Sequence, residues 1–332
     1  MHSRLLGTTG IHISAISFGA GPVPALLTKA GALERQRATL RRALEAGINW
    51  FDTAATYGEG QSERSLGESL GDALEGDLVE RVHIATKVRI PAEFPADLRG
   101  YIRESVRGSL ERLRRPRVTL LQLHNSITAA RGAQPTSLAP EDVLGTGGVL
   151  EAFQELRQEG YASHLGLTGL GEPPALLEVL RTRGFEVMQI PFHVCNPSAG
   201  TTLVPAGVEA NYGNLIGECE RLGIGVLAIR VLAGGALAGQ PPSDHTRSTK
   251  FFPMPVFERD RRVAEALARE LPVEMPLKEL AIRYVLGQPG VSSALIGFSS
   301  PEQIDEALEY AARGPLDPEL SVWVNRWLQQ HG

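Results

Sequence analysis

The sequence predicts an α/β protein whose strands close into a single (β/α)8 TIM barrel. Short apolar runs rich in β-branched residues alternate with longer stretches in which apolar residues recur every three to four positions, and this unit repeats about eight times along 332 residues. Such alternation favours parallel strands covered by helices. A doubly wound fold is disfavoured, because Gly19-Ala20-Gly21 after the first run lacks the third glycine of a dinucleotide-binding turn.

Eight runs account for the predicted strands, and the stretches between them have helical spacing. Ile102, Val106, Leu110 and Leu113 illustrate that spacing. Residues 1–13 are expected to form a hairpin that plugs the bottom of the barrel, and residues 317–330 an additional helix. No linker or charge block divides the chain, so residues 1–332 are interpreted as one domain. The predicted strands are 14–19, 48–52, 82–87, 118–124, 164–168, 187–191, 226–231 and 292–297.

Three connections are too long for simple turns between a strand and a helix. They are residues 125–148, 192–204 and 232–256, and each follows the carboxyl end of a predicted strand. Barrel enzymes build their active sites at that face. Long irregular loops there are typical of substrate lids and cofactor clamps, which is how we interpret them.

Composition limits the classes of partner. A formal net charge of -5 argues against an overall basic surface for nucleic acid, and no run of about 18 apolar residues could span a membrane. Residues 1–10 lack the layout of a secretion signal. Cys195 and Cys219 are too few for a disulfide framework, and the eight histidines show no metal-ligand spacing, so no metal is predicted. These features indicate a cytoplasmic globular protein, with its oligomeric state open.

Four polar residues stand at or just beyond the ends of three successive predicted strands: Asp52, Tyr57, Lys87 and His124. Strand ends converge at one mouth of a barrel, so these side chains are expected to meet. A lysine that ends an apolar strand needs a counter-charge, which Asp52 can supply. The cation then favours phenolate over phenol at Tyr57, so that this residue can exchange a proton near neutral pH, while His124 orients the reacting oxygen.

The same region resembles the aldo/keto reductase superfamily over about residues 4–312. The resemblance implies a (β/α)8 barrel, reversible hydride transfer between a nicotinamide cofactor and a carbonyl or alcohol, and no metal. It implies Tyr57 as general acid and base, Lys87 and Asp52 as the pair that tunes it, and His124 as the carbonyl-orienting group. The matching motifs are Leu6-Gly7-Thr8-Thr9-Gly10, Phe51-Asp52-Thr53-Ala54 with Tyr57-Gly58, Thr86-Lys87, Leu121-Gln122-Leu123-His124 and Ile296-Gly297.

The resemblance also implies where the cofactor binds. Gln189 would hold the nicotinamide carboxamide, and Phe192 would stack on the ring. Thr168 keeps the hydroxyl of the family's Ser-Asn pair but not the amide, and Arg230 could neutralise the pyrophosphate. The complete set of candidate cofactor contacts is Gly19, Thr168, Gln189, Phe192, Arg230, Leu232, Gly234, Gly297, Ser299, Gln303 and Glu306.

The choice between NAD and NADP rests on residues 297–303. Ser300 is predicted as the N-cap of a helix, with Pro301 at its first position and Gln303 completing a capping box. A helix N-terminus attracts anions, but this stretch contains no lysine or arginine for a 2′-phosphate. The stretch therefore favours NAD.

The predicted function is that of an NAD(P)-dependent oxidoreductase acting on a small aldehyde, ketone or sugar. One alternative within enzymes is an NAD-dependent aldose 1-dehydrogenase. An alternative of another class is a cofactor-binding regulatory barrel subunit with little turnover.

Overall fold

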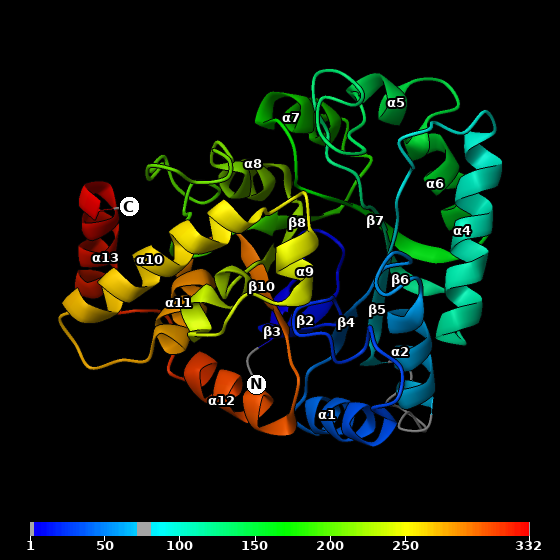
Figure 1. Ribbon diagram of the computed structural model, residues 1–332. Helices are drawn as coiled ribbons and strands as arrows, with labels where there is room; N and C mark the ends of the chain where they lie inside the picture. Colours follow the sequence, from blue (N-terminus) through cyan, green and yellow to red (C-terminus); the bar gives the residue numbers. More distant parts are fainter. Residues whose placement is uncertain (1–2, 72–80, 332) are drawn as a thin grey trace.

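Eight parallel strands form a closed barrel at the centre of the computed structural model, which describes residues 3–71 and 81–331 (Figure 1). Each strand is a short, almost entirely buried apolar run, as expected where helices cover a parallel sheet. In pairing order the strands are β3 (Ile16–Gly19), β4 (Trp50–Asp52), β5 (His83–Val88), β6 (Val118–Leu123), β7 (Ala162–Thr168), β8 (Val187–Pro191), β9 (Gly225–Ile229) and β10 (Val291–Gly297), which pairs with both β9 and β3.

Helices surround the barrel because their apolar faces cover its outer surface (Figure 1). The principal ones are α1 (Leu33–Glu45), α2 (Gln61–Gly71), α4 (Leu98–Leu113), α6 (Val149–Gln158), α7 (Pro173–Arg181), α8 (Leu215–Leu222), α10 (Met254–Glu270), α11 (Leu277–Gly287) and α12 (Pro301–Ala312). A final helix, α13 (Pro318–His331), lies beside α10 and α11, where Trp327 donates to Glu270 at 2.8 Å and Tyr284 to Asn325 at 2.9 Å.

The barrel prediction is confirmed: the strand 187–191 has the predicted bounds, and the other seven predicted strands are present with one or both ends shifted. The first barrel strand begins at Ile16 and not at Ser14, because residues 12–14 pair antiparallel with residues 3–5. The seventh ends at Ile229, because Arg230 has a φ of 58°, which extended backbone does not allow.

The hairpin β1 (Ser3–Leu5) and β2 (His12–Ser14) closes the bottom of the barrel. Its Leu6 and Ile13 pack in one buried cluster with Trp50, Ala85 and other inward-facing strand residues. Gly7 explains how the hairpin fits so closely, since a Cβ there would lie 2.2 Å from the backbone nitrogen of Gly225. The opposite, carboxyl end of the barrel is therefore the end left for a site.

Two of the three long connections contain short helices at that carboxyl end. Residues 125–148 include α5 (Pro140–Leu144), and residues 232–256 include η1 (Ala233–Ala238) and α9 (Asp244–Ser248). Lys29, in the connection after β3, pairs with Asp244 of α9 at 3.5 Å, so two connections meet over the mouth. Within the described residues, no helix has the length and apolarity needed to cross a membrane.

Candidate active site

The ends of β4, β5 and β6 bring three of the predicted catalytic side chains together. Side chains alternate across a strand, so the residue two beyond a barrel-filling side chain also points inward. Trp50 and Ala85 fill the layer nearest the hairpin, and Asp52 and Lys87 form the next layer above them. His124 follows β6 directly and is buried, while Tyr57 reaches the same mouth from the connection after β4.

Lys87 is the centre of this arrangement. Its side chain has no exposed surface, and its Nζ donates to Oδ1 of Asp52 at 2.5 Å, to the carbonyl of Thr53 at 2.8 Å and to the phenol oxygen of Tyr57 at 3.3 Å. An ammonium group has three protons, so every donor has a partner. Burial acts against the ammonium, but the Asp52 carboxylate and Tyr57 outweigh it and raise the pKa of Lys87.

Asp52 receives hydrogen bonds on both carboxylate oxygens. Oδ1 accepts from Lys87, and Oδ2 accepts from Nε2 of Gln122 at 3.1 Å and from Nε2 of Gln189 at 2.5 Å. Burial raises the pKa of Asp52, and the charge of Lys87 and the three donors oppose that rise. The carboxylate is thus held within the barrel by groups from three other strands.

Tyr57 and His124 face each other at the mouth. Their ring centroids lie 5.5 Å apart in an edge-to-face arrangement, and Nδ1 of His124 lies 3.3 Å from the hydroxyl of Thr56. Burial, followed by the charges of Lys87 and Arg89, holds the pKa of His124 well below its ordinary value. His124 is therefore neutral at physiological pH and offers a hydrogen bond without carrying a charge.

Buried polar residues of α2 hold the strands and the Tyr57 connection in place. The hydroxyl of Ser62 contacts that of Thr53 at 2.7 Å and donates to the carbonyl of Ala20. Glu63 accepts from Thr86 at 2.5 Å and from Arg112 at 2.7 Å, which ties α2 to β5 and α4. These bonds position Lys87 and Tyr57 from outside the site.

Arg230 is the candidate cofactor residue whose surroundings suit an anion. It follows β9 in a left-handed conformation, its guanidinium lies 3.8 Å from the ring centre of Phe252, and its Nη2 lies 3.6 Å from the carboxylate of Asp260. Within the described residues, its buried Nε has no hydrogen-bond partner. Leu232 and Gly234 lie just beyond, and a Cβ on Gly234 would approach no atom closer than 3.8 Å.

The start of α12 is built differently from the predicted capping box. Ser300 is the N-cap and Pro301 opens the helix, but Ser300 makes no capping hydrogen bond to a backbone N–H. Gln303 instead accepts from the backbone nitrogen of Ser299 at 2.8 Å. Residues 297–303 contain no lysine or arginine, but a cation from another helix reaches them, since Arg35 of α1 donates to the carbonyl of Ser299 at 2.6 Å.

Several candidate cofactor residues have their polar groups engaged elsewhere. The Thr168 hydroxyl donates to the carbonyl of Leu123 at 3.2 Å, and the Gln189 amide donates to Asp52. Glu306 is bound by Lys278 and by Tyr310. The structure thus shows these side chains in contacts within the fold, and not free at the mouth.

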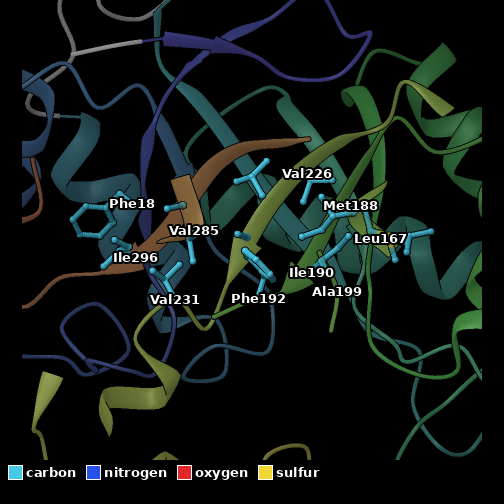
Figure 2. Packing of buried hydrophobic residues seen from close by; sticks show 14 of the residues in the cluster. Phe18, Leu167, Met188, Ile190, Phe192, Ala199, Val226, Val231, Val285 and Ile296 are labelled. Atoms are coloured by element: carbon cyan, nitrogen blue, oxygen red, sulfur yellow. The ribbon is translucent and has the colours of Figure 1, made fainter. Parts of the chain in front are cut away.

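Phe192 and two glycines serve packing. Phe192 has no exposed surface and stacks on Tyr284 of α11 at 5.7 Å between ring centroids; Figure 2 shows it among core side chains such as Ile190 and Ala199. A Cβ on Gly297 would lie 2.3 Å from the carbonyl oxygen of Val23, and one on Gly19 would lie 3.3 Å from β10. No face of Phe192 is open for the predicted stacking on nicotinamide, because α11 covers it.

Two residues at this site are not among the catalytic or cofactor residues that the sequence predicts. They are Gln122, which belongs to one of the matching motifs, and Arg89. Both lie two positions from a catalytic candidate, Gln122 before His124 and Arg89 after Lys87. The two-residue period of a strand was the signal that could have identified them.

Comparison with known proteins agrees with this geometry. The sequence profile described as the Aldo/keto reductase family matches residues 16–321. The chain belongs to the aldo/keto reductase family. As a member, it is an NAD(P)-dependent oxidoreductase of the TIM-barrel type. Within residues 3–71 and 81–331, no three His, Cys, Asp or Glu side chains gather as a metal-binding group.

Individual relatives show how far the similarity to family members extends. The chain is 29% identical to L-galactose dehydrogenase from Arabidopsis thaliana, over 91% of this chain and 86% of the relative. It is 28% identical to D-threo-aldose 1-dehydrogenase from a Pseudomonas species, over 95% and 93%. The holo structure of an aldo-keto reductase from Bacillus halodurans has the same fold, with a TM-score of 0.73 at 24% identity and coverage of 99% and 96%.

Proposed function

We propose that this aldo/keto reductase transfers a hydride between a nicotinamide cofactor and a small carbonyl compound or its alcohol, with Tyr57 as proton donor and acceptor. The observation that carries the proposal is the single ammonium of Lys87, which contacts the Asp52 carboxylate and lies 3.3 Å from the phenol oxygen. A cation at that distance stabilises negative charge on the oxygen, so Tyr57 can release its proton.

The proton and hydride balance of the reaction defines the roles. In reduction, the carbonyl carbon gains a hydride, its oxygen gains a proton, and the product is an alcohol; oxidation returns both. The cofactor, when bound, supplies or accepts the hydride. Tyr57 would donate the proton at its phenol oxygen, while the neutral His124 holds the same substrate oxygen by a hydrogen bond. Lys87 and Asp52 stabilise the charge left on Tyr57.

The residues after β9 suit the phosphates of the cofactor. Arg230 has an unpartnered buried Nε within the described residues, and its charge complements a pyrophosphate. A Cβ on Gly234 would approach no atom closer than 3.8 Å, so a phosphate has room to approach the backbone there. The backbone N–H and the hydroxyl of Ser299, by contrast, are both bound to Gln303. We propose that Arg230, Leu232 and Gly234 would hold the dinucleotide.

Different observations favour two forms of this function. The names of the two dehydrogenase relatives, and the lack of lysine or arginine in residues 297–303, support NAD-dependent oxidation of an aldose at C1. The position of Arg35 beside Ser299 supports recognition of a 2′-phosphate, and hence carbonyl reduction with NADPH. A regulatory subunit with little turnover is the less supported alternative, because it does not need the complete set of catalytic contacts.

Steady-state assays test the proposal. Turnover is measured with NADPH and NADH on small aldehydes, and with NADP and NAD on aldoses such as L-galactose. Tyr57→Phe is expected to lower turnover by about 10²- to 10⁴-fold while cofactor still binds in a fluorescence titration. Tyr161→Phe, directly before β7 at the opposite end of the barrel, is the control that keeps activity. Unchanged turnover in Tyr57→Phe would overturn the proton-transfer role, and cofactor binding without turnover on any carbonyl would favour the regulatory subunit.

A further inference from the structure

Arg89 places a second cation at the mouth, two residues beyond Lys87. Its side chain is half-buried, and its Nε is fully buried with no hydrogen-bond partner among the described residues. Burial lowers the pKa of Arg89 from its ordinary value, and the nearby Tyr57 opposes that change. An arginine remains charged at neutral pH even so, and therefore this part of the mouth is positive.

No carboxylate neutralises Arg89 in the part of the chain that the structure describes. Other arginines around the barrel have such partners: Arg112 pairs with Glu63 at 2.7 Å, and Arg230 lies 3.6 Å from Asp260. A partly desolvated cation without a counter-ion is costly. Arg89 is thus available to pair with the negative charge of a bound ligand.

The Arg89 guanidinium lies near the reacting groups, with an aromatic ring over one face. Phe251, from the connection after β9, covers the guanidinium with its ring centre 4.8 Å away. A ring on one face of a guanidinium leaves its in-plane N–H groups available to other acceptors. After burial, the charges of Lys87 and Arg89 lower the pKa of His124, so Arg89 acts on the same small region as His124 and Tyr57.

We propose that Arg89 binds an anionic group, a carboxylate or a phosphate, on the carbonyl substrate. This inference rests on the proposed function and specifies the class of substrate. A guanidinium matches the planar fork of a carboxylate or the oxygens of a phosphate. Arg89 and Arg230 lie at the same mouth, since the consecutive residues Phe251 and Phe252 cover them. We assign the cofactor phosphates to Arg230 and the substrate anion to Arg89, because Arg89 lies two residues beyond Lys87 and acts on His124.

Matched substrates test the inference. The ratio of kcat/KM for succinic semialdehyde to that for butanal measures preference for a carboxylate, and glyceraldehyde 3-phosphate against glyceraldehyde measures preference for a phosphate. The wild-type protein is expected to prefer at least one anionic member by about tenfold or more. Arg89→Gln is expected to bring that ratio close to one, and Arg89→Lys to retain part of it. Lys250→Gln removes an exposed charge next to Phe251 and is expected to leave the ratio unchanged.

A binding measurement separates this inference from the proposed function. Calorimetry is done on protein saturated with oxidised cofactor, so that Arg230 is occupied by the dinucleotide. Succinate or inorganic phosphate, which contain no reducible carbonyl, is then expected to bind to the wild type and to Tyr57→Phe, and to lose binding in Arg89→Gln. If Tyr57→Phe remained active while Arg89→Gln lost anion binding, only the proton-transfer role would fail. A substrate ratio that Arg89→Gln does not change, or equal anion binding by Arg89→Gln and wild type, would overturn the role of Arg89.

Discussion

The side-chain amide of Gln189 donates to Oδ2 of Asp52 at 2.5 Å, which links β8 to β4 through the interior of the barrel. Family resemblance implies that this glutamine holds the nicotinamide carboxamide. In the structure it holds the carboxylate that neutralises Lys87, together with Gln122. The glutamine therefore acts beneath the site, through Asp52.

Substitution of Gln189 distinguishes these two roles. Gln189→Met is expected to destabilise the protein by about 1–3 kcal/mol, since a buried carboxylate loses a donor. It is also expected to shift the pH profile of kcat, while the Kd for reduced cofactor stays near that of the wild type. Gln122→Met is the matched control and should change the same quantities. A large rise in cofactor Kd with an unchanged pH profile would restore the carboxamide role.

Removal of Lys87 tests how much the buried Lys87–Asp52 ion pair contributes to the stability of the protein. Lys87→Met leaves Asp52 as a buried carboxylate without a counter-charge, which lowers the free energy of unfolding by about 3–5 kcal/mol. The double variant Lys87→Met with Asp52→Asn removes both charges and should recover much of that loss. Urea denaturation measures the free energy of unfolding of the wild type, of Lys87→Met and of the double variant. Equal stability of the single and double variants would mean that the pair carries no coupling energy, contrary to the geometry.

Arg35 is expected to influence the choice of cofactor. Because it contacts the carbonyl of Ser299 at the start of α12, Arg35→Gln should lower the ratio of kcat/KM for NADPH to that for NADH, by about tenfold if the guanidinium binds the 2′-phosphate. Arg41→Gln, on the exposed face of the same helix, is the control. An unchanged ratio would mean that Arg35 does not bind the 2′-phosphate, and the lack of lysine and arginine in residues 297–303 would then favour NAD.

Asp260 gives stability a specific dependence on pH. It is buried, its Oδ1 accepts from Arg259 at 3.1 Å, and burial raises its pKa from 3.8 to about 6 although Arg230 and Arg259 oppose that rise. The folded protein thus keeps a proton that the unfolded chain releases at lower pH. This group accordingly makes the free energy of unfolding fall as the pH rises from about 4 to about 6.

Asp260→Asn is expected to remove that component of the pH dependence, which is on the order of 1–3 kcal/mol. Urea denaturation of both proteins at several pH values measures it, and the difference in stability between wild type and variant should change across this interval and be constant above about pH 7. A difference that does not vary with pH would show that Asp260 is ionised throughout.

Much of the barrel and the catalytic constellation could be predicted because both depend on local patterns. The apolar runs define the strands, and parallel strands of a closed barrel all end at the same mouth. Asp52 ends β4, Lys87 lies next to the end of β5, and His124 directly follows β6, so chain order alone brings them together. Tyr57 is placed by its short distance in sequence from Asp52.

The contacts of the cofactor candidates could not be predicted in the same way. Phe192 follows β8 just as His124 follows β6, yet it is fully buried and stacks on Tyr284 of α11. The local stretch 297–303 contains no cation, and only the packing of α1 against α12 brings Arg35 to it. Neither outcome is visible in the residues next to the site.

The amino-acid sequence by itself determined the strand order, the end of the barrel that carries the chemistry, and the four residues that meet there, because periodicity and succession along the chain are sufficient for each. Only the tertiary structure decided which groups neutralise one another: Gln189 is bonded to Asp52, and Arg89 is left without a carboxylate among the described residues. The physical reason is that charge pairing and hydrogen bonding depend on distances of a few ångströms between side chains far apart in the sequence, and packing alone sets those distances.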